Sequence, residues 1–411
     1  MNRPMTKTLP RHRAWIGIVY FLVAATPGFW FPIVTNILNA QGWSHIITWT
    51  FLIPPLVGMI SPLIFAARAD QHIHAEKLLA GVLLAGSCFL FLAFQELERG
   101  LHPERFLIFL ALNALITAPA WSLLTTITLT YVDTGKGSFG LFRVWATLGW
   151  MAAGWIVSSQ ALDSSPTTGH LAVGTRVIAA LCCLMLPSTP PRGKATGRWQ
   201  DAFGLSALKL MRDRDVAVFL ITSSVFSIPL AAFYMHTPPM LKELGVERVA
   251  AVLTIGQATE VFAILGIAFV MRKVRIKWLL LFALFCGLAR YVLYAIAAHQ
   301  HSVTIAVIGI GFHGLCWTFF YEAGRIFLDK KVSFAFRNQI QALMGMFSGC
   351  IGSLVGTLLC GALYDEIVLD DISGWPVYWG LLSGLIVLCI IGFLLGYKGN
   401  PPGQAPQADH P

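Results

Sequence analysis

Long apolar stretches, separated by short polar segments, follow one another along the whole chain. A transmembrane helix needs about 20 mostly apolar residues to cross the hydrocarbon core of a bilayer, and twelve stretches reach this length. The pattern therefore predicts an all-α membrane protein with twelve transmembrane helices. The predicted spans are residues 14–38, 45–67, 77–97, 105–131, 139–160, 170–187, 215–240, 249–270, 277–298, 303–327, 338–363 and 375–397.

The longest polar stretch between spans, residues 188–214, divides them six and six. This division, with a long basic loop at its centre, is typical of the major facilitator fold, in which two six-helix bundles surround a site near the membrane midplane. We therefore predict an N-terminal bundle over residues 1–187, a cytoplasmic loop over 188–214 and a C-terminal bundle over 215–397. Residues 398–411 are polar and proline-rich and predict a disordered cytoplasmic tail.

Composition and charge agree with a membrane location. The chain is 56% hydrophobic and only 12% charged, whereas soluble domains carry about 25% charged residues. With the N-terminus in the cytoplasm, 22 of the 29 lysines and arginines lie at cytoplasmic ends, and only Arg99, Arg105, Lys242 and Arg248 lie outside. The positive-inside rule then places both termini in the cytoplasm. The formal charge of +9 reflects this topology, so we expect no nucleic-acid partner.

Motifs for metal, cofactor or enzymatic chemistry are not found in the sequence. The eight cysteines lie inside apolar stretches without zinc-ligand or redox-pair spacing, so we expect neither a metal site nor disulfides. There is no phosphate-binding loop, nucleophile elbow or zinc-protease motif. These observations favour a transporter over an enzyme. We expect no cofactor, and a driving force that comes from an ion gradient or from the substrate itself.

Two ionisable residues interrupt the apolar spans. Glu260 lies one turn after Gln257 in the span 249–270, and the spacing of three places both side chains on one helix face. Arg143 begins a similar stripe with Thr147 and Trp150. A charge at that depth costs about 2.5–3.5 kcal/mol on insertion scales and usually lines a cavity or pathway. An acid and a base within the spans suggest ion-coupled transport, with a structural salt bridge as the alternative.

Glu260 has the properties that proton coupling requires. Burial disfavours its ionised form, whereas a nearby cation favours that form, so the carboxyl group can take a proton on one side and release it on the other. The indole of Trp150 beside amide and hydroxyl groups suits a planar, polar ligand. Tyr234 and His313 are further polar residues within spans, and a role in packing is the alternative for each.

Several segments resemble the bacterial nucleoside:proton symporter family of the major facilitator superfamily. They are Phe142-Arg-Val-Trp-Ala-Thr-Leu-Gly149, Gly256-Gln-Ala-Thr-Glu260, Ala289-Arg290 followed by Tyr-Val-Leu-Tyr-Ala, and the stretch from Asp329 to Gln341. The resemblance covers most of the chain and is strongest from residue 139 onward. It implies a carrier of the bacterial inner membrane.

The resemblance also implies roles for individual residues. The positions of Arg143, Thr147, Gln257 and Glu260 match residues that line the nucleoside site of the family, and the acid is the one tied to proton coupling. Trp150 falls where the family can have another aromatic residue. The sequence departs from the family at five positions, where other polar or aromatic residues are expected: Ala231, Tyr234, His313, Trp317 and Thr318.

Together these observations predict a monomeric secondary transporter that carries nucleosides, or a similar small polar metabolite, with protons by alternating access. Glu260 titrates and Arg143 modulates it. The predicted substrate contacts are Arg143, Thr147, Trp150, Tyr234, Gln257, Glu260, His313 and Trp317. Hydrogen bonds come from Thr147 and Gln257, and Trp150 and Trp317 stack on the ligand. The alternatives are a carrier for sugars, oligosaccharides or aromatic acids, an exporter, or a membrane receptor that transports nothing.

Overall fold

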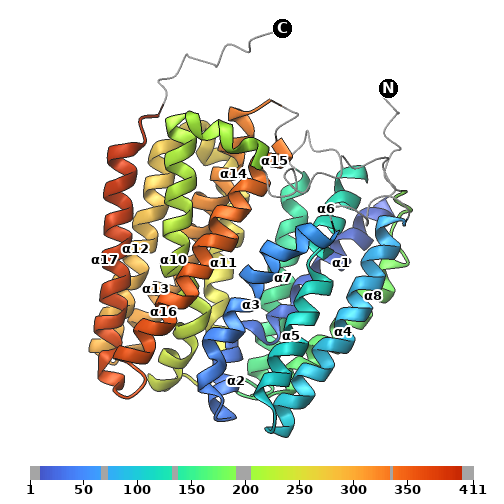
Figure 1. The fold of residues 1–411 in the computed structure, drawn as a ribbon, viewed down its shortest axis with the longest axis horizontal. Helices are drawn as coiled ribbons and strands as arrows, with labels where there is room; N and C mark the ends of the chain where they lie inside the picture. The colour runs from blue at the N-terminus through green and yellow to red at the C-terminus, as the bar shows by residue number, and fades with distance from the viewer. Residues whose placement is uncertain (1–9, 66–72, 132–137, 191–204, 334–336, 400–411) are drawn as a thin grey trace. The chain divides into compact units, whose positions relative to one another are not determined.

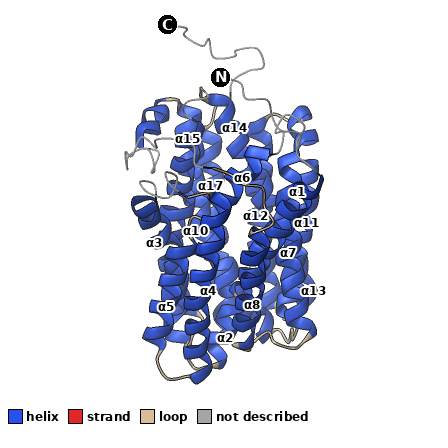
Figure 2. Cartoon of the chain, turned by 90° about the vertical axis from the view of Figure 1, so that its right-hand side faces the viewer, coloured by secondary structure: helices blue, strands red, loops and turns tan. Residues whose placement is uncertain are grey.

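The computed structural model describes residues 10–65, 73–131, 138–190, 205–333 and 337–399. Within these ranges every regular element is a helix (Figure 2). Ten helical segments are long and apolar enough to cross a membrane. They correspond to ten of the predicted spans, so the all-helical membrane fold is confirmed for these. The predicted fifth and sixth spans correspond to α7 (Ser138–Ser159) and α8 (Thr167–Cys183), which lie outside the ten, so the count of twelve is not confirmed.

Contacts group the chain into two units, and each combines two stretches of sequence. The N-terminal unit contains Met1–Trp199 and Ala232–Val261, and the C-terminal unit contains Gln200–Ala231 and Phe262–Pro411. The long helices α10 (Arg214–Glu243) and α11 (Val249–Lys273) each contribute to both units. The predicted boundary in the loop 188–214 stays a prediction, because residues 191–204 lie outside the described ranges.

The N-terminal unit contains the first eight α-helices. They are α1 (Pro10–Gly28), α2 (Val34–Ala40), α3 (Ile47–Phe65), α4 (Ala75–Arg99), α5 (Pro103–Thr117), α6 (Ala120–Tyr131), α7 and α8. Helix α4 packs between α5 and α8, as Figure 1 shows. Pro119 stands between α5 and α6, where a proline cannot donate the backbone hydrogen bond that would continue the helix. The predicted span 105–131 is therefore two helices joined by a break.

Helices α1 and α7 pack closely because glycines stand where their backbones approach. A Cβ added to Gly149 of α7 would lie 2.0 Å from the carbonyl oxygen of Phe21, and one added to Gly28 of α1 would lie 3.0 Å from the backbone of Trp150. Neither neighbour is a side-chain end that can rotate away. Small residues at such crossings are the usual basis of close helix packing in membranes. The contact fixes the position of α7, which carries three of the predicted site residues.

The C-terminal unit is built around α12 (Ile276–His299), which packs against α13 (Val303–Trp317) and α17 (Trp375–Gly396). The other helices are α14 (Ala323–Lys331), α15 (Arg337–Met344) and α16 (Ser353–Ile367). A π-helical turn, Thr318–Glu322, joins α13 to α14, and a second, Gly345–Gly352, joins α15 to α16. The buried ring of Trp379 stacks on Tyr291 at a centroid distance of 5.4 Å.

The span 338–363 carries several glycines on one face, and only some of them allow close packing against another helix. A Cβ on Gly352 would lie 2.4 Å from the carbonyl oxygen of Ser224, and one on Gly356 would lie 2.6 Å from that of Ile228. Both glycines therefore let this span approach the first half of α10. Gly345 and Gly349 have no such neighbour within 4 Å. The close approach is confined to the later part of the face.

The start of the predicted C-terminal tail is held by hydrogen bonds. The backbone N–H groups of Lys398 and Gly399 donate to the two carboxylate oxygens of Asp215, at 2.9 and 3.0 Å. Residues 400–411, which make up the rest of the predicted tail, lie outside the described residues.

Candidate functional site

The stripe predicted on α7 is present in the structure. Thr147 is buried, and Arg143 and Trp150 are half-buried. The hydroxyl of Thr147 donates to the carbonyl oxygen of Arg143 at 3.2 Å, a backbone contact that is common for threonine in helices. The oxygen of Thr147 still has acceptor capacity for a ligand.

Three aromatic rings from different helices meet beside this stripe. The ring centroids of Trp150 and Tyr234 are 5.9 Å apart, with an interplanar angle of 48°. Phe31, from the short helical turn after α1, lies 5.6 Å from Tyr234 and 6.4 Å from Trp150. Phe31 was not among the predicted site residues. Its apolar side chain and its place beside Pro32 give no sequence signal that separates it from a packing residue.

Gln257 joins the aromatic group to α11. Its side-chain amide donates to the hydroxyl of Tyr234 at 2.9 Å. The side chain is 3% exposed, and its carbonyl oxygen has no hydrogen-bond partner within the described residues. Glu260 follows one turn later and is half-buried. The structure therefore brings Trp150, Tyr234 and Gln257 together, and their role as substrate contacts stays a prediction.

The start of α11 is fixed to the end of α7 by a hydrogen-bonded cluster. One carboxylate oxygen of Asp163 accepts from the hydroxyl of Ser158 at 2.8 Å and from the N–H of Ala250 at 2.7 Å. The Ser158 oxygen accepts from the N–H of Ala251 at 2.9 Å. These bonds satisfy N–H groups that the first turn of a helix leaves unpaired. Burial raises the pKa of Asp163, although the bonds from Ala250 and Ser158 act in the opposite direction.

A second pair of contacts lies one turn deeper along the same two helices. The indole N–H of Trp155 donates to the hydroxyl of Thr254 at 3.0 Å. A Cβ on Gly154 would lie 3.0 Å from the carbonyl oxygen of Ala250 and from the methyl group of Thr254. Together with the Asp163 cluster, these contacts set the spacing of α7 and α11 and thereby of Trp150 and Gln257.

The other predicted site residues form a separate group in the C-terminal unit. His313 and Trp317 stack on each other at 6.4 Å and 20°. Arg290, which is 0% exposed, donates to Nδ1 of His313 at 2.8 Å and to the hydroxyl of Tyr291 at 2.7 Å. Because a guanidinium group can only donate, Nδ1 of His313 is the acceptor. His313 is therefore a hydrogen-bonded, buried histidine, and Trp317 remains half-buried.

These observations define a class of protein. Ten membrane-crossing helical segments carry a cluster of polar and aromatic side chains on helix faces. Polar and ionisable groups within membrane helices usually mark a substrate or ion pathway. In the described residues no group of three or more His, Cys, Asp or Glu side chains is placed to hold a metal ion. These membrane-crossing helices and their polar cluster are the features expected of a secondary transporter.

Comparison with known proteins identifies the family. A family model described as nucleoside H+ symporter matches residues 13–401. The putative nucleoside transporter YegT of Escherichia coli (strain K12) is 28% identical over 390 residues, covering 90% of each chain. The nucleoside permease NupG of Escherichia coli is 23% identical over 359 residues, covering 84% of this chain and 85% of NupG.

Solved structures show the same fold. Two crystal structures of NupG, one of them a mutant, match with TM-scores of 0.85 and 0.81 at 22% identity. They cover 94% and 95% of this chain and 100% of each solved chain. The chain therefore belongs to the nucleoside H+ symporter family, as the sequence resemblance predicts. It is a proton-coupled nucleoside transporter of the bacterial inner membrane, and its family function is transport and not enzymatic.

Proposed function

We propose that the nucleoside binds in the N-terminal unit against α7, α10 and α11, with Gln257 at the centre of the site. The observation that carries this proposal is the buried carbonyl oxygen of Gln257, which has no partner within the described residues. A buried acceptor without a partner costs about 1–3 kcal/mol. A nucleoside carries N–H and O–H donors that would remove this cost when it binds.

The aromatic rings beside Gln257 suit the flat face of a nucleobase. The ring centroids of Trp150, Tyr234 and Phe31 lie within 6.4 Å of one another. Stacking of a base on an aromatic side chain contributes about 1–3 kcal/mol in single-stranded nucleic-acid complexes. We assign base stacking to Trp150, and a hydrogen bond to the oxygen of Thr147. Trp317 and His313 lie in the C-terminal unit, and a role for them in substrate binding stays a prediction from the sequence.

Glu260 is the proposed carrier of the coupled proton. It lies one turn from Gln257 on the same helix face and is half-buried. A carboxyl group in that position responds both to its surroundings and to the bound ligand. Arg143, half-buried on α7, is the proposed modulator of that response. Proton transfer at Glu260 and ligand binding at Gln257 are thereby coupled over one helical turn.

We further propose twelve transmembrane helices, both termini in the cytoplasm, operation by alternating access and a monomeric state. The 22 basic residues at the predicted cytoplasmic ends support this orientation. Reporter fusions at the two termini test it, because a cytoplasmic terminus gives fluorescence with green fluorescent protein and no periplasmic phosphatase activity. Light scattering of the purified protein tests the monomer.

Uptake into proteoliposomes tests the transport proposal. We expect labelled uridine or adenosine to accumulate above the outside concentration when the outside is more acidic, and only to equilibrate without a gradient. Competition with unlabelled nucleosides and sugars then separates the alternatives. Inhibition by sugars without inhibition by nucleosides would contradict the proposal, as would saturable binding of nucleosides without flux.

A further inference from the structure

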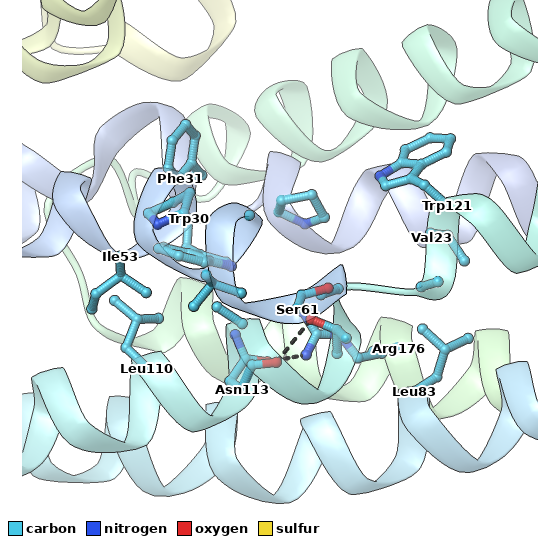
Figure 3. A pocket seen from close by; sticks show the side chains of 18 of the residues that line it. Val23, Trp30, Phe31, Ile53, Ser61, Leu83, Leu110, Asn113, Trp121 and Arg176 are labelled. Carbon is cyan, nitrogen blue, oxygen red and sulfur yellow. Dashed lines mark hydrogen bonds between the residues drawn. The ribbon is translucent and has the colours of Figure 1, made fainter. Parts of the chain in front are cut away.

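A cavity of about 580 Å³ lies within the N-terminal unit, apart from the Gln257 site. Its wall is mostly apolar and comes from α1, α3, α5 and α6, with Val23, Ile53, Leu110 and Trp121 among the lining residues (Figure 3). The volume falls in the range of about 300–1,000 Å³ that is usual for small-molecule sites. Such sites combine an apolar wall with a few polar groups at fixed positions.

The polar part of this wall is a buried cation. Arg176 of α8 and Asn113 of α5 are 6% and 4% exposed, and both line the cavity. The guanidinium group of Arg176 donates to the side-chain oxygen of Asn113, and the two side chains point toward one another in Figure 3. No carboxylate in the described part of the chain forms an ion pair with Arg176, and no acidic residue is among those that line the cavity.

Helix α4 is shaped to accommodate this pair. A Cβ on Gly86 would lie 2.3 Å from the methyl group of Thr117, 3.3 Å from a guanidinium nitrogen of Arg176 and 3.6 Å from the side-chain oxygen of Asn113. The absence of a side chain at Gly86 therefore lets α5 and α8 bring the two polar groups together. The cation is held by a specific packing arrangement of three helices.

A buried charge without a counter-ion is costly, because the ion loses its hydration and gains no opposite charge in return. A neutral amide offsets only part of this cost. A guanidinium group also presents five N–H donors in a planar fork that matches carboxylate and phosphate oxygens. An anionic group in the cavity would supply the missing countercharge, and the apolar wall would cover the rest of the ligand.

We propose that this cavity binds an amphipathic anion, whose carboxylate or phosphate group contacts Arg176 and Asn113 and whose apolar body contacts the surrounding aliphatic and aromatic side chains. Phe31 lines the cavity and also contacts Trp150 and Tyr234. The ligand therefore shares one ring with the proposed nucleoside site without using Gln257.

Binding of decanoate to the full chain in an uncharged detergent tests the proposal, with equilibrium dialysis as the readout and equal detergent in both chambers. We expect saturable binding to the wild type that is at least 10-fold weaker in Arg176→Gln and partly kept in Arg176→Lys. The matched control is Arg105→Gln, which changes an exposed arginine of α5 and should bind like the wild type. Decyl phosphate should compete, and decanol should not.

A second variant keeps the test valid if Arg176→Gln does not fold. Ala114→Trp fills the cavity from α5 and leaves both polar side chains in place, so it should also weaken binding at least 10-fold. Equal binding by the wild type and Arg176→Gln, or by the wild type and Ala114→Trp, would overturn the proposal. So would the lack of saturable binding of both decanoate and decyl phosphate.

The lipid composition of the bilayer distinguishes two possible sources of the ligand, the membrane and the aqueous phase. In nanodiscs of phosphatidylcholine, decanoate should bind as it does in detergent. If phosphatidylglycerol in the disc suppresses that binding, the occupant is an anionic membrane lipid. If binding is unchanged, the occupant is a soluble amphipathic acid. Either result supports the site, and neither depends on nucleoside transport.

Discussion

The side chain of Gln257 combines two roles in one amide group. Its N–H group donates to the hydroxyl of Tyr234 at 2.9 Å, and in the proposed site its buried carbonyl oxygen accepts a hydrogen bond from the ligand. The first hydrogen bond stabilises the unliganded site, and the second strengthens the binding of a substrate that carries a matching donor. A residue of this kind discriminates strongly, because a ligand without the matching donor leaves the acceptor unpaired.

Replacing Gln257 by leucine should therefore weaken nucleoside binding. We expect the loss of one buried hydrogen bond to the ligand to cost about 1.4 kcal/mol of binding free energy. This cost corresponds to a roughly 10-fold higher dissociation constant for uridine. The matched control is Thr259→Val on the same helix, whose hydroxyl donates to the backbone oxygen of Gly256 at 2.8 Å. Isothermal titration of the purified variants measures both. Unchanged affinity in Gln257→Leu would place the nucleoside elsewhere.

At the level of residues, part of the proposed site can be predicted from the sequence. Gln257, Trp150 and Tyr234 were predicted as substrate contacts, because a polar or amphipathic side chain within an apolar span is conspicuous. Phe31, which contacts Trp150 and Tyr234, is not predicted, because a phenylalanine in an apolar span has no such contrast. Arg176 and Asn113 lie 63 residues apart, and no local pattern in the sequence indicates that they meet.

At the scale of helices, close packing of α1 on α7 is the contact that positions the stripe of Arg143, Thr147 and Trp150. It depends on Gly149, which belongs to the segment that carries the family resemblance. The nearest atoms to a Cβ at this position are the carbonyl oxygen and carbon of Phe21, at 2.0 and 2.7 Å. Because these are backbone atoms, the helices must separate to admit a methyl group.

Gly149→Ala should consequently destabilise the protein. Overpacking of a tight interface costs about 1–3 kcal/mol, and a backbone clash lies at the upper end of that range. The matched control is Gly81→Ala in α4, where a Cβ meets nothing within 4 Å and alanine favours the helix. Thermal unfolding in detergent should show a lower midpoint only for Gly149→Ala. Equal midpoints would mean that α1 and α7 do not approach this closely.

Hydropathy predicted the positions of the long helices because the requirement for about 20 apolar residues is strict. It did not predict their internal breaks. The span 105–131 contains the break between α5 and α6 at Pro119, and the span 303–327 contains a π-helical turn, Thr318–Glu322. Prolines alone do not locate such breaks, since Pro229, Pro238 and Pro239 all lie inside the continuous helix α10. Whether a proline interrupts a membrane helix depends on its neighbours.

For the molecule as a whole, the decisive question is how nucleoside movement is tied to protons. The family establishes that the coupling exists. The proposed site places one carboxyl group, Glu260, a single turn from the ligand-binding amide of Gln257. The depth of this acid in its span indicates it from the sequence, and the structure adds that it is half-buried.

Replacing Glu260 by glutamine keeps the size and shape of the side chain but removes its ability to titrate. We expect this variant to exchange labelled uridine across proteoliposomes and to lose accumulation driven by an inward proton gradient. The matched control is Glu322→Gln, which changes another half-buried acid in a membrane span, 4.0 Å from Arg325. This control should still accumulate uridine. If both variants accumulate, Glu260 is not the coupling group. If neither variant accumulates uridine, coupling depends on membrane carboxylates in general. The position of Glu260 next to the proposed ligand contact Gln257 would then not be what couples protonation to binding.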